Sequence, residues 1–192
     1  MTDLSTLDDE RLMGRYIDGD RGAFSELFRR FAPRLHGWFL RTTGSEPLAQ
    51  DMVQQTFLHV HRARHDFARG APVRPWVFAI AANVRRQHHR TRQRKPETFW
   101  DADRHREPSV GPGVSTGQDR AVRAALEELS EAAREVVVLH WYEGMSFPEI
   151  ASVVGASHSA VKVRAHRAYK QLRGILGARA SNDLDGTKTG TS

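Results

Sequence analysis

Cysteine is absent from the 192 residues of this chain, and so are long apolar runs. The first absence excludes a disulfide framework and a thiolate metal site. The second excludes a membrane-spanning helix, which needs roughly 20 consecutive apolar residues. The acidic N-terminal segment MTDLSTLDDERLMGRY also lacks the apolar stretch of a signal peptide. We therefore predict a cytoplasmic protein without membrane insertion.

Alternation of apolar and polar residues, the mark of a half-buried strand, is missing too, and helical spacing takes its place. Apolar residues recur three and four positions apart at Phe24, Leu27, Phe28, Phe31, Leu35 and Phe39. Gly44 ends this run, and Ser45 is suited to cap the next helix. The apolar stripe of that helix is Val53, Phe57 and Val60. The sequence predicts an all-α fold.

Composition divides the chain into two small helical domains joined by a flexible linker. Residues 1–95 hold the pattern described above, and residues 119–177 hold a second helical pattern. Residues 96–118 are rich in proline, glycine, serine and charge without periodicity, which is typical of a linker. Residues 178–192 are small and polar, and we predict a disordered tail there.

The ten histidines do not fall at the spacing of a helical metal site. His59 and His61 are two residues apart, and His88 and His89 are adjacent, so on a helix the members of each pair point in different directions. The sequence contains neither a glycine-rich phosphate loop nor a nucleophile motif. We expect no catalytic residues, no metal site and no cofactor.

The formal net charge of +6 favours a polyanionic partner, either nucleic acid or an anionic membrane surface. Two helices are predicted at 147–154 and 158–174, and Ser146 with Glu149 forms a capping box before the first of them. Gly155 permits the sharp turn between them. This pattern is typical of a helix-turn-helix, whose second helix enters the DNA major groove.

Basic residues on the second helix share one exposed face. Spacing places together Lys162, Val163, His166 and Arg167. We predict that Lys162 and Arg167 contact base edges, while Arg164, Lys170 and Arg173 at the flanks contact phosphates. A solvated basic helix without a partner is the alternative interpretation of the same pattern.

A second basic run, RRQHHRTRQRK, follows the apolar half of a helix in the first domain. It holds six arginines and lysines in eleven residues and no acid, as a surface that follows a phosphate backbone would. Asn83 and the loop from Phe67 to Pro75 are candidates for a pocket around an unstacked base. For Trp76 we favour a core position. The run by itself also fits an RNA-binding tail.

Both halves together resemble one known family. AQDMVQQTFLHVHRAR followed by VRPWVFAIAANVRRQHHRTRQRK resembles the sigma-70 initiation factors of RNA polymerase, specifically their extracytoplasmic-function (ECF) group. LEELSEAAREVVVLHWYEGMSFPEIASVVGASHSAVKVRAHRAYKQLR resembles the second conserved domain of that group. The resemblance implies a non-enzymatic initiation factor whose partners are promoter DNA, the β′ clamp and β flap of core polymerase, and an anti-sigma factor.

The resemblance also implies roles for particular residues. The polymerase-binding face matches at Asp51, Gln54 and Gln55. In the helix that melts the minus-ten element, Asn83 would contact the non-template strand, and the phosphates would be held by Arg85, Arg86 and Arg90. The minus-thirty-five element would be contacted by Lys162, Val163, Arg164, His166, Arg167 and Lys170.

Two further interpretations remain open from the residues themselves. A helix-turn-helix regulator of the response-regulator type would carry the same C-terminal pattern without being a polymerase subunit. It would need alternating strands and an acidic pocket in its N-terminal half, where the pattern here is helical. A protein-interaction module whose basic helices bind an acidic partner would share the charge distribution.

Overall fold

A computed structural model describes residues 3–94 and 117–186, and every regular element in these two ranges is a helix. The first range, here called the N-terminal body, contains η1 (Leu4–Thr6), α1 (Asp9–Ile17), α2 (Arg21–Thr43), α3 (Glu46–Ala63), η2 (Arg64–Asp66) and α4 (Val73–Arg94). The second range, the C-terminal body, contains α5 (Gly117–Glu127), α6 (Glu131–Trp141), α7 (Phe147–Val154) and α8 (His158–Gly186). The predicted all-α fold is confirmed. Most of the predicted linker lies outside the described residues.

The N-terminal body is built on α2, whose apolar stripe faces α3 and α4. Phe31, Leu35, Trp38 and Phe39 are all fully buried. The stripe predicted on α3 is buried as well, because its members lie three and four residues apart on the side that faces α2. Gly44 ends α2 with a φ of 72°, a conformation that glycine adopts without a steric penalty.

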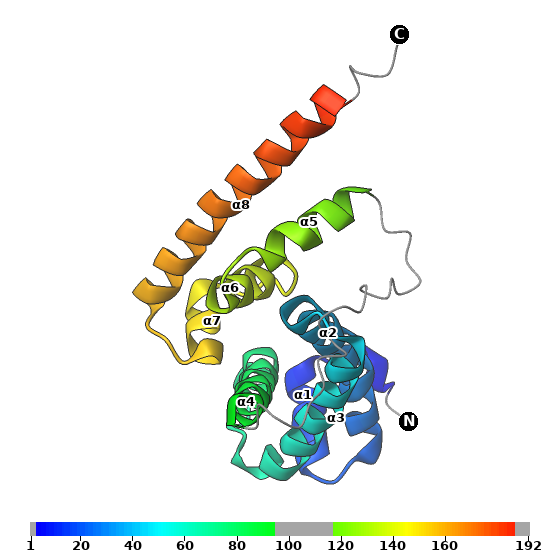
Figure 1. Cartoon of the computed structure of the whole chain (residues 1–192). Coiled ribbons are helices and arrows are strands. Elements are labelled where there is room, and N and C mark those ends of the chain that lie inside the picture. Colours follow the sequence, from blue (N-terminus) through cyan, green and yellow to red (C-terminus); the bar gives the residue numbers. More distant parts are fainter. Residues whose placement is uncertain (1–2, 95–116, 187–192) are drawn as a thin grey trace.

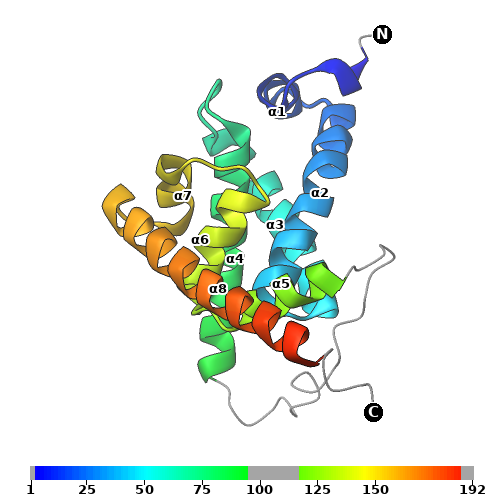
Figure 2. The ribbon, with the colours of Figure 1, turned by 90° about the horizontal axis from the view of Figure 1, so that it is seen from above.

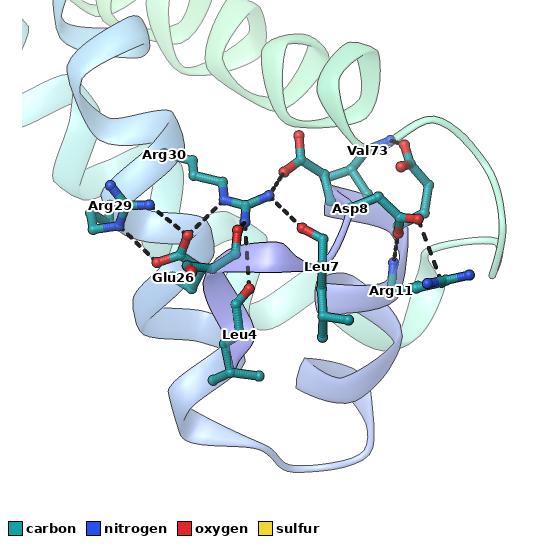
Figure 3. Close-up of polar contacts among 11 residues, drawn as sticks. Leu4, Leu7, Asp8, Arg11, Glu26, Arg29, Arg30 and Val73 are labelled. Carbon is teal, nitrogen blue, oxygen red and sulfur yellow. Dashed lines mark hydrogen bonds and ion pairs between the residues drawn. The ribbon is translucent and has the colours of Figure 1, made fainter. Parts of the chain in front are cut away.

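Arg30 fastens the start of the chain to α2 (Figure 3). Its guanidinium donates hydrogen bonds to the carbonyl oxygens of Ser5 and Leu7, each at 2.8 Å. The same group pairs with Asp9 at 2.9 Å and with Glu26 at 2.7 Å. One cation therefore satisfies acceptors from η1, α1 and α2, which fixes these elements relative to one another.

The C-terminal body has the predicted helix-turn-helix geometry. Ser146 and Glu149 form a reciprocal capping box at the start of α7, and Gly155 ends that helix with a φ of 66°. Ser157 accepts a hydrogen bond from the Ala160 amide at 3.2 Å and so caps the start of α8. Ile150 and Val153 of α7 are buried.

Two helix boundaries differ from the predicted ones. Helix α4 begins at Val73, so Pro75 lies inside its first turn, where the missing amide hydrogen has no partner to lose. Helix α8 continues to Gly186 instead of stopping near residue 174, so residues 178–186 are helical where we expected a disordered tail. Gly174 weakens a helix by only about 1 kcal/mol relative to alanine, which does not end it.

The two bodies pack against each other (Figures 1 and 2). Helix α7 lies along α4, and α6 lies against α2. Helix α8 is on the far side of the C-terminal body, with α6 and α7 between it and the N-terminal body (Figure 1). The sequence had indicated two loosely tethered bodies, whereas in the structure buried apolar residues of both bodies form one cluster, and the charged contacts described below add to it.

Candidate nucleic-acid and polymerase interface

The recognition helix α8 presents the predicted reading face to solvent. Exposed side chains on this face are Lys162, Val163, His166, Arg167 and Lys170, and Arg164 beside them is half-buried. On the opposite side, Val161, Ala165 and Ala168 are at most 1% exposed and pack into the core. The helix is therefore held by its apolar stripe while its basic face stays free of the core.

His140 does not belong to this reading face. Its Nδ1 lies 2.8 Å from the carbonyl oxygen of Met145, and its ring stacks on Phe147 with 4.8 Å between centroids. The imidazole thus ties the end of α6 to the start of α7. The structure therefore gives His140 a role in the turn that positions α7.

A pocket of about 290 Å³ opens beside Asn83 on the N-terminal body. Its walls come from α3, η2 and α4, and its lining residues are His59, Arg62, Ala63, Asp66, Ile80, Asn83, Val84 and Gln87. Asn83 is exposed, and its Oδ1 accepts a hydrogen bond from Arg86 at 2.5 Å. The pocket combines an apolar floor with amide, imidazole and guanidinium groups, as a site for a planar polar ring requires.

The loop that was expected to form this pocket does not line it. Phe67 is only 5% exposed, and its ring packs edge-on against Trp76 at 5.0 Å. Trp76 is partly buried in the core cluster, as predicted. The side chain of Phe67 turns inward because its ring is more stable against Trp76 than in water. Helix α3 supplies the wall in their place.

The predicted phosphate-binding arginines of α4 are unequally available. Arg90 is exposed, and Arg86 is half-buried with a guanidinium nitrogen 3.4 Å from the carbonyl oxygen of Val154. The side chain of Arg85 is only 7% exposed and pairs with Glu131 and Glu135 of the C-terminal body. In this arrangement Arg85 is not on the nucleic-acid surface.

Two further contacts between the bodies repeat this pairing of N-terminal arginines with C-terminal glutamates. Arg34 meets Glu143 at 2.9 Å, and Arg74 meets Glu149 at 3.1 Å and the carbonyl oxygen of Glu143 at 3.0 Å. Burial raises the pKa of Glu143, and the nearby Arg34 counteracts that rise. Burial also acts to raise the pKa of Glu149, but hydrogen bonds from Ser146 and Arg74 hold that pKa below its ordinary value.

The predicted polymerase-binding face of α3 is fully accessible. Asp51, Gln54 and Gln55 are exposed, and Gln55 donates a hydrogen bond to Asp51 at 2.6 Å. Leu58 continues the same face one turn later and is 48% exposed. Phe28 of α2, which packs on the ring of Phe57 from the adjacent helix, is 41% exposed. Sequence reasoning missed both apolar residues. Phe28 has the spacing of the core positions of α2, and Leu58 was not considered although its spacing places it with Gln54 and Gln55.

The described residues contain neither a cluster of metal ligands nor a membrane-spanning helix. Within residues 3–94 and 117–186, no three histidine or carboxylate side chains gather in a way that could hold a metal ion. In the same ranges, no helix has both the length and the apolar character that crossing a bilayer needs.

Comparison with known proteins identifies the two bodies. Residues 27–95 match the family described as Sigma-70 region 2, and residues 119–172 match the family described as Sigma-70, region 4. The chain is 39% identical over 171 residues to the RNA polymerase sigma factor CarQ of Myxococcus xanthus, which covers 86% of this chain and 95% of CarQ. It is 31% identical over 179 residues to the ECF RNA polymerase sigma factor RpoE of Cereibacter sphaeroides, covering 90% and 98%.

A solved structure agrees over nearly the whole chain. CnrH in complex with the cytosolic domain of CnrY has a TM-score of 0.68 to this structure at 32% identity, covering 88% of this chain and 97% of CnrH. With region 2 and region 4 both matched, the chain belongs to the sigma-70 family. Within that family it is an ECF sigma factor, a non-enzymatic protein that directs transcription initiation by RNA polymerase. The response-regulator interpretation is therefore set aside.

Proposed function

We propose that this sigma factor docks on the β′ clamp of core polymerase through the exposed face of α3. The polar group of Asp51, Gln54 and Gln55 supplies directional hydrogen bonds, and Leu58 supplies apolar area beside them. An exposed leucine next to a polar rim is the composition that protein interfaces favour. The C-terminal body would hold the β flap at the same time.

In the same proposal, α8 reads the minus-thirty-five element, and the pocket beside Asn83 receives a base of the melted minus-ten element. The observation that carries the first assignment is the division of α8 into a buried apolar stripe and an exposed basic face. The pocket beside Asn83 supports the second assignment. Arg86 and Arg90 lie one and two turns further along α4, in position to follow the strand backbone.

Run-off transcription tests this proposal. Core polymerase is assayed with and without the purified chain on genomic promoter fragments, and we expect transcripts from a distinct set of fragments only when the chain is present. A chain that fails to associate with core polymerase at modest salt would refute the proposal.

An anti-sigma factor is the second proposed partner. CnrH, which aligns with this chain over most of its length, was solved in complex with the cytosolic domain of CnrY. The exposed apolar residues Phe28, Leu58 and Trp141 give such an inhibitor area to cover. Purified inhibitor should then suppress run-off transcription in proportion to its concentration, and substitution of Trp141 by aspartate should relieve the suppression. We infer a cytoplasmic location as well, because the proposed polymerase partner acts there.

A further inference from the structure

Val163 is an exposed apolar residue among the cations of the recognition helix α8. Among the side chains that the structure describes, it is the most exposed large apolar residue of this helix, at 49%. Its neighbours in the chain are Lys162 and Arg164, and the segment from Lys162 to Lys170 contains no acidic residue. A basic face that only followed phosphates would have no use for a valine. The residue therefore points to a different kind of contact.

Helical geometry directs Val163 away from the protein. The buried stripe of α8 includes Val161 and Ala165, which are 0% and 1% exposed. These residues come two positions before and after Val163, so each lies roughly 160° around the helix axis from it. Val163 is thus at the centre of the exposed face, and the exposed Lys162 and Arg167 lie on either side of it.

Position along α8 places Val163 where a recognition helix lies closest to the bases. Helix α8 begins at His158, so Val163 is in its second turn. In helix-turn-helix proteins, the N-terminal residues of the recognition helix contact base edges in the major groove. Lysine and arginine side chains are long enough to turn towards phosphates, whereas valine is short and contacts only what lies directly in front of it. For Val163 in a major groove, that is a base edge.

The fold itself gives no reason for a valine at this position. A β-branched side chain loses rotamer freedom in a helix, so valine favours a helix less than alanine, lysine or arginine does. Among the described residues, Val163 is not a member of the core cluster. Its exposed carbon atoms are in unfavourable contact with water in the free protein. A contact formed in the complex with DNA explains a residue of this kind.

The major groove offers one apolar group to such a side chain. All four bases present polar donors or acceptors at the groove edge, and thymine alone adds a C5-methyl group. A valine pressed against a polar edge displaces water and replaces none of the lost hydrogen bonds, which is unfavourable. Against thymine, apolar surface of both partners leaves water together. The side chain of Val163 therefore distinguishes thymine from the other bases.

We propose that Val163 selects a thymine in the minus-thirty-five element by packing on its C5-methyl group. The inference rests on the proposed function, because it assumes that α8 enters the major groove. Lys162 and Arg167, on either side of Val163, supply the hydrogen bonds that guanine accepts at its major-groove edge. The element should thus contain a thymine close to guanine, with a separate side chain responsible for each preference.

Removal of one methyl group from the DNA tests the contact. The purified chain first enriches duplexes at low salt from a pool with a randomised segment, and we expect a thymine in the enriched sequence. Replacement of this thymine by deoxyuridine deletes the C5-methyl group and leaves every hydrogen-bonding group of the base pair unchanged. Wild-type protein should bind the deoxyuridine duplex about fourfold more weakly, the effect of one buried carbon group. Fluorescence anisotropy of labelled duplexes measures both affinities.

Val163→Ala separates this contact from the other contacts of α8. The shorter side chain does not reach the methyl group, so the variant should bind the thymine duplex about fourfold more weakly than wild type does. It should bind the deoxyuridine duplex as tightly as wild type does. The two deletions should not add, because each removes one side of the same contact. Additive losses would overturn the proposal.

Arg173→Ala is the matched control on the same helix. Arg173 is exposed and lies about three turns after Val163, where we predict a phosphate contact. Its loss should weaken binding to the thymine and deoxyuridine duplexes equally, which preserves the wild-type ratio of the two affinities. If Val163→Ala preserves this ratio as well, Val163 does not read the methyl group. Circular dichroism verifies that both variants are folded.

Failure of this inference can be distinguished from failure of the proposed function. Enrichment of one duplex sequence shows that the chain reads DNA, whichever group Val163 contacts. An enriched sequence without a thymine preference, or equal binding of the thymine and deoxyuridine duplexes by wild type, would refute the Val163 contact alone. The absence of any enriched sequence would refute duplex reading by α8, and this inference with it.

Discussion

The two basic helices α4 and α8 carry similar charge, yet their basic side chains differ in exposure to solvent. Lys162, Arg167 and Lys170 of α8 are exposed, whereas Arg85 of α4 is buried against glutamates of the other body. The difference does not come from either helix alone. It comes from position, because α7 packs along α4 while α8 lies on the far side of the C-terminal body (Figure 1). Availability of a DNA-binding side chain thus depends on what packs against it.

Substitution of Arg85, compared with substitution of Arg90, should show the largest effect, a loss of free energy of unfolding. Arg85→Ala leaves Glu135 buried without its cation, which we expect to cost about 3–5 kcal/mol of the packing between the bodies. Arg90→Ala removes an exposed side chain, and its effect on stability should stay within about 0.5 kcal/mol. Denaturant unfolding of both variants measures the difference. Equal stabilities would mean that the ion pair does not hold the bodies together.

A comparison within α8 should show the next largest effect. Arg167→Ala should weaken binding to the minus-thirty-five duplex by roughly 1–3 kcal/mol and relax specificity at one base position. Arg173→Ala, further along the helix, should weaken binding uniformly across sequences and reduce the log–log salt slope by roughly 0.9. Titrations of both variants against matched and scrambled duplexes separate these outcomes. Normal discrimination by Arg167→Ala would remove it from the base-reading set.

Exposed apolar residues on the two bodies allow a reciprocal comparison. Leu58→Ala should weaken binding to core polymerase by about 1 kcal/mol, because the residue adds apolar area to the proposed clamp face. Val163→Ala on α8, 49% exposed, should leave polymerase binding unchanged and affect only promoter reading. Competition against another sigma factor for core polymerase measures both. If only Val163→Ala lost affinity for polymerase, the docking surface would lie on the C-terminal body and not on α3.

Much of each body could be predicted from the sequence, because local rules determine it. The capping box at Ser146, the turn at Gly155 and the division of α8 into two faces depend on residues a few positions apart. The contact between the bodies depends on pairs such as Arg85 with Glu135, which are far apart in the chain and have no periodicity to reveal them. One signal was available. Glu135 is an acid inside the apolar run EVVVL, and a buried acid requires a cationic partner.

The residue roles are less predictable than the helices for a related reason. Helical spacing shows which residues share a face, but it does not distinguish an exposed apolar residue from a core one. Phe28 has the spacing of a core residue of α2 and is 41% exposed. Arg85 lies within a basic run and is buried. Both exceptions lie at surfaces where partners are proposed to bind.

The ion pairs of Glu26 inside the N-terminal body should have the smallest effect on stability. They contrast with the ion pairs between the two bodies. Hydrogen bonds from Arg29 and Arg30 lower the pKa of Glu26 from 4.5 to about 2. Since the folded-state pKa is lowered, the stabilisation is present above pH 4.5 and is lost as pH falls towards about 2. We expect a small decrease in thermal stability across that window, because solvent screens the pair.

Glu26→Gln should remove this part of the acid dependence while leaving DNA binding at neutral pH unchanged. The substitution lies within the Arg30 cluster that anchors the start of the chain (Figure 3), and it removes no partner of Arg34 or Arg85. Thermal unfolding of wild type and variant between pH 5 and pH 2, measured side by side, provides the test. If Glu26→Gln instead changed DNA binding at neutral pH, the role of this cluster would not be confined to stabilising the N-terminal body.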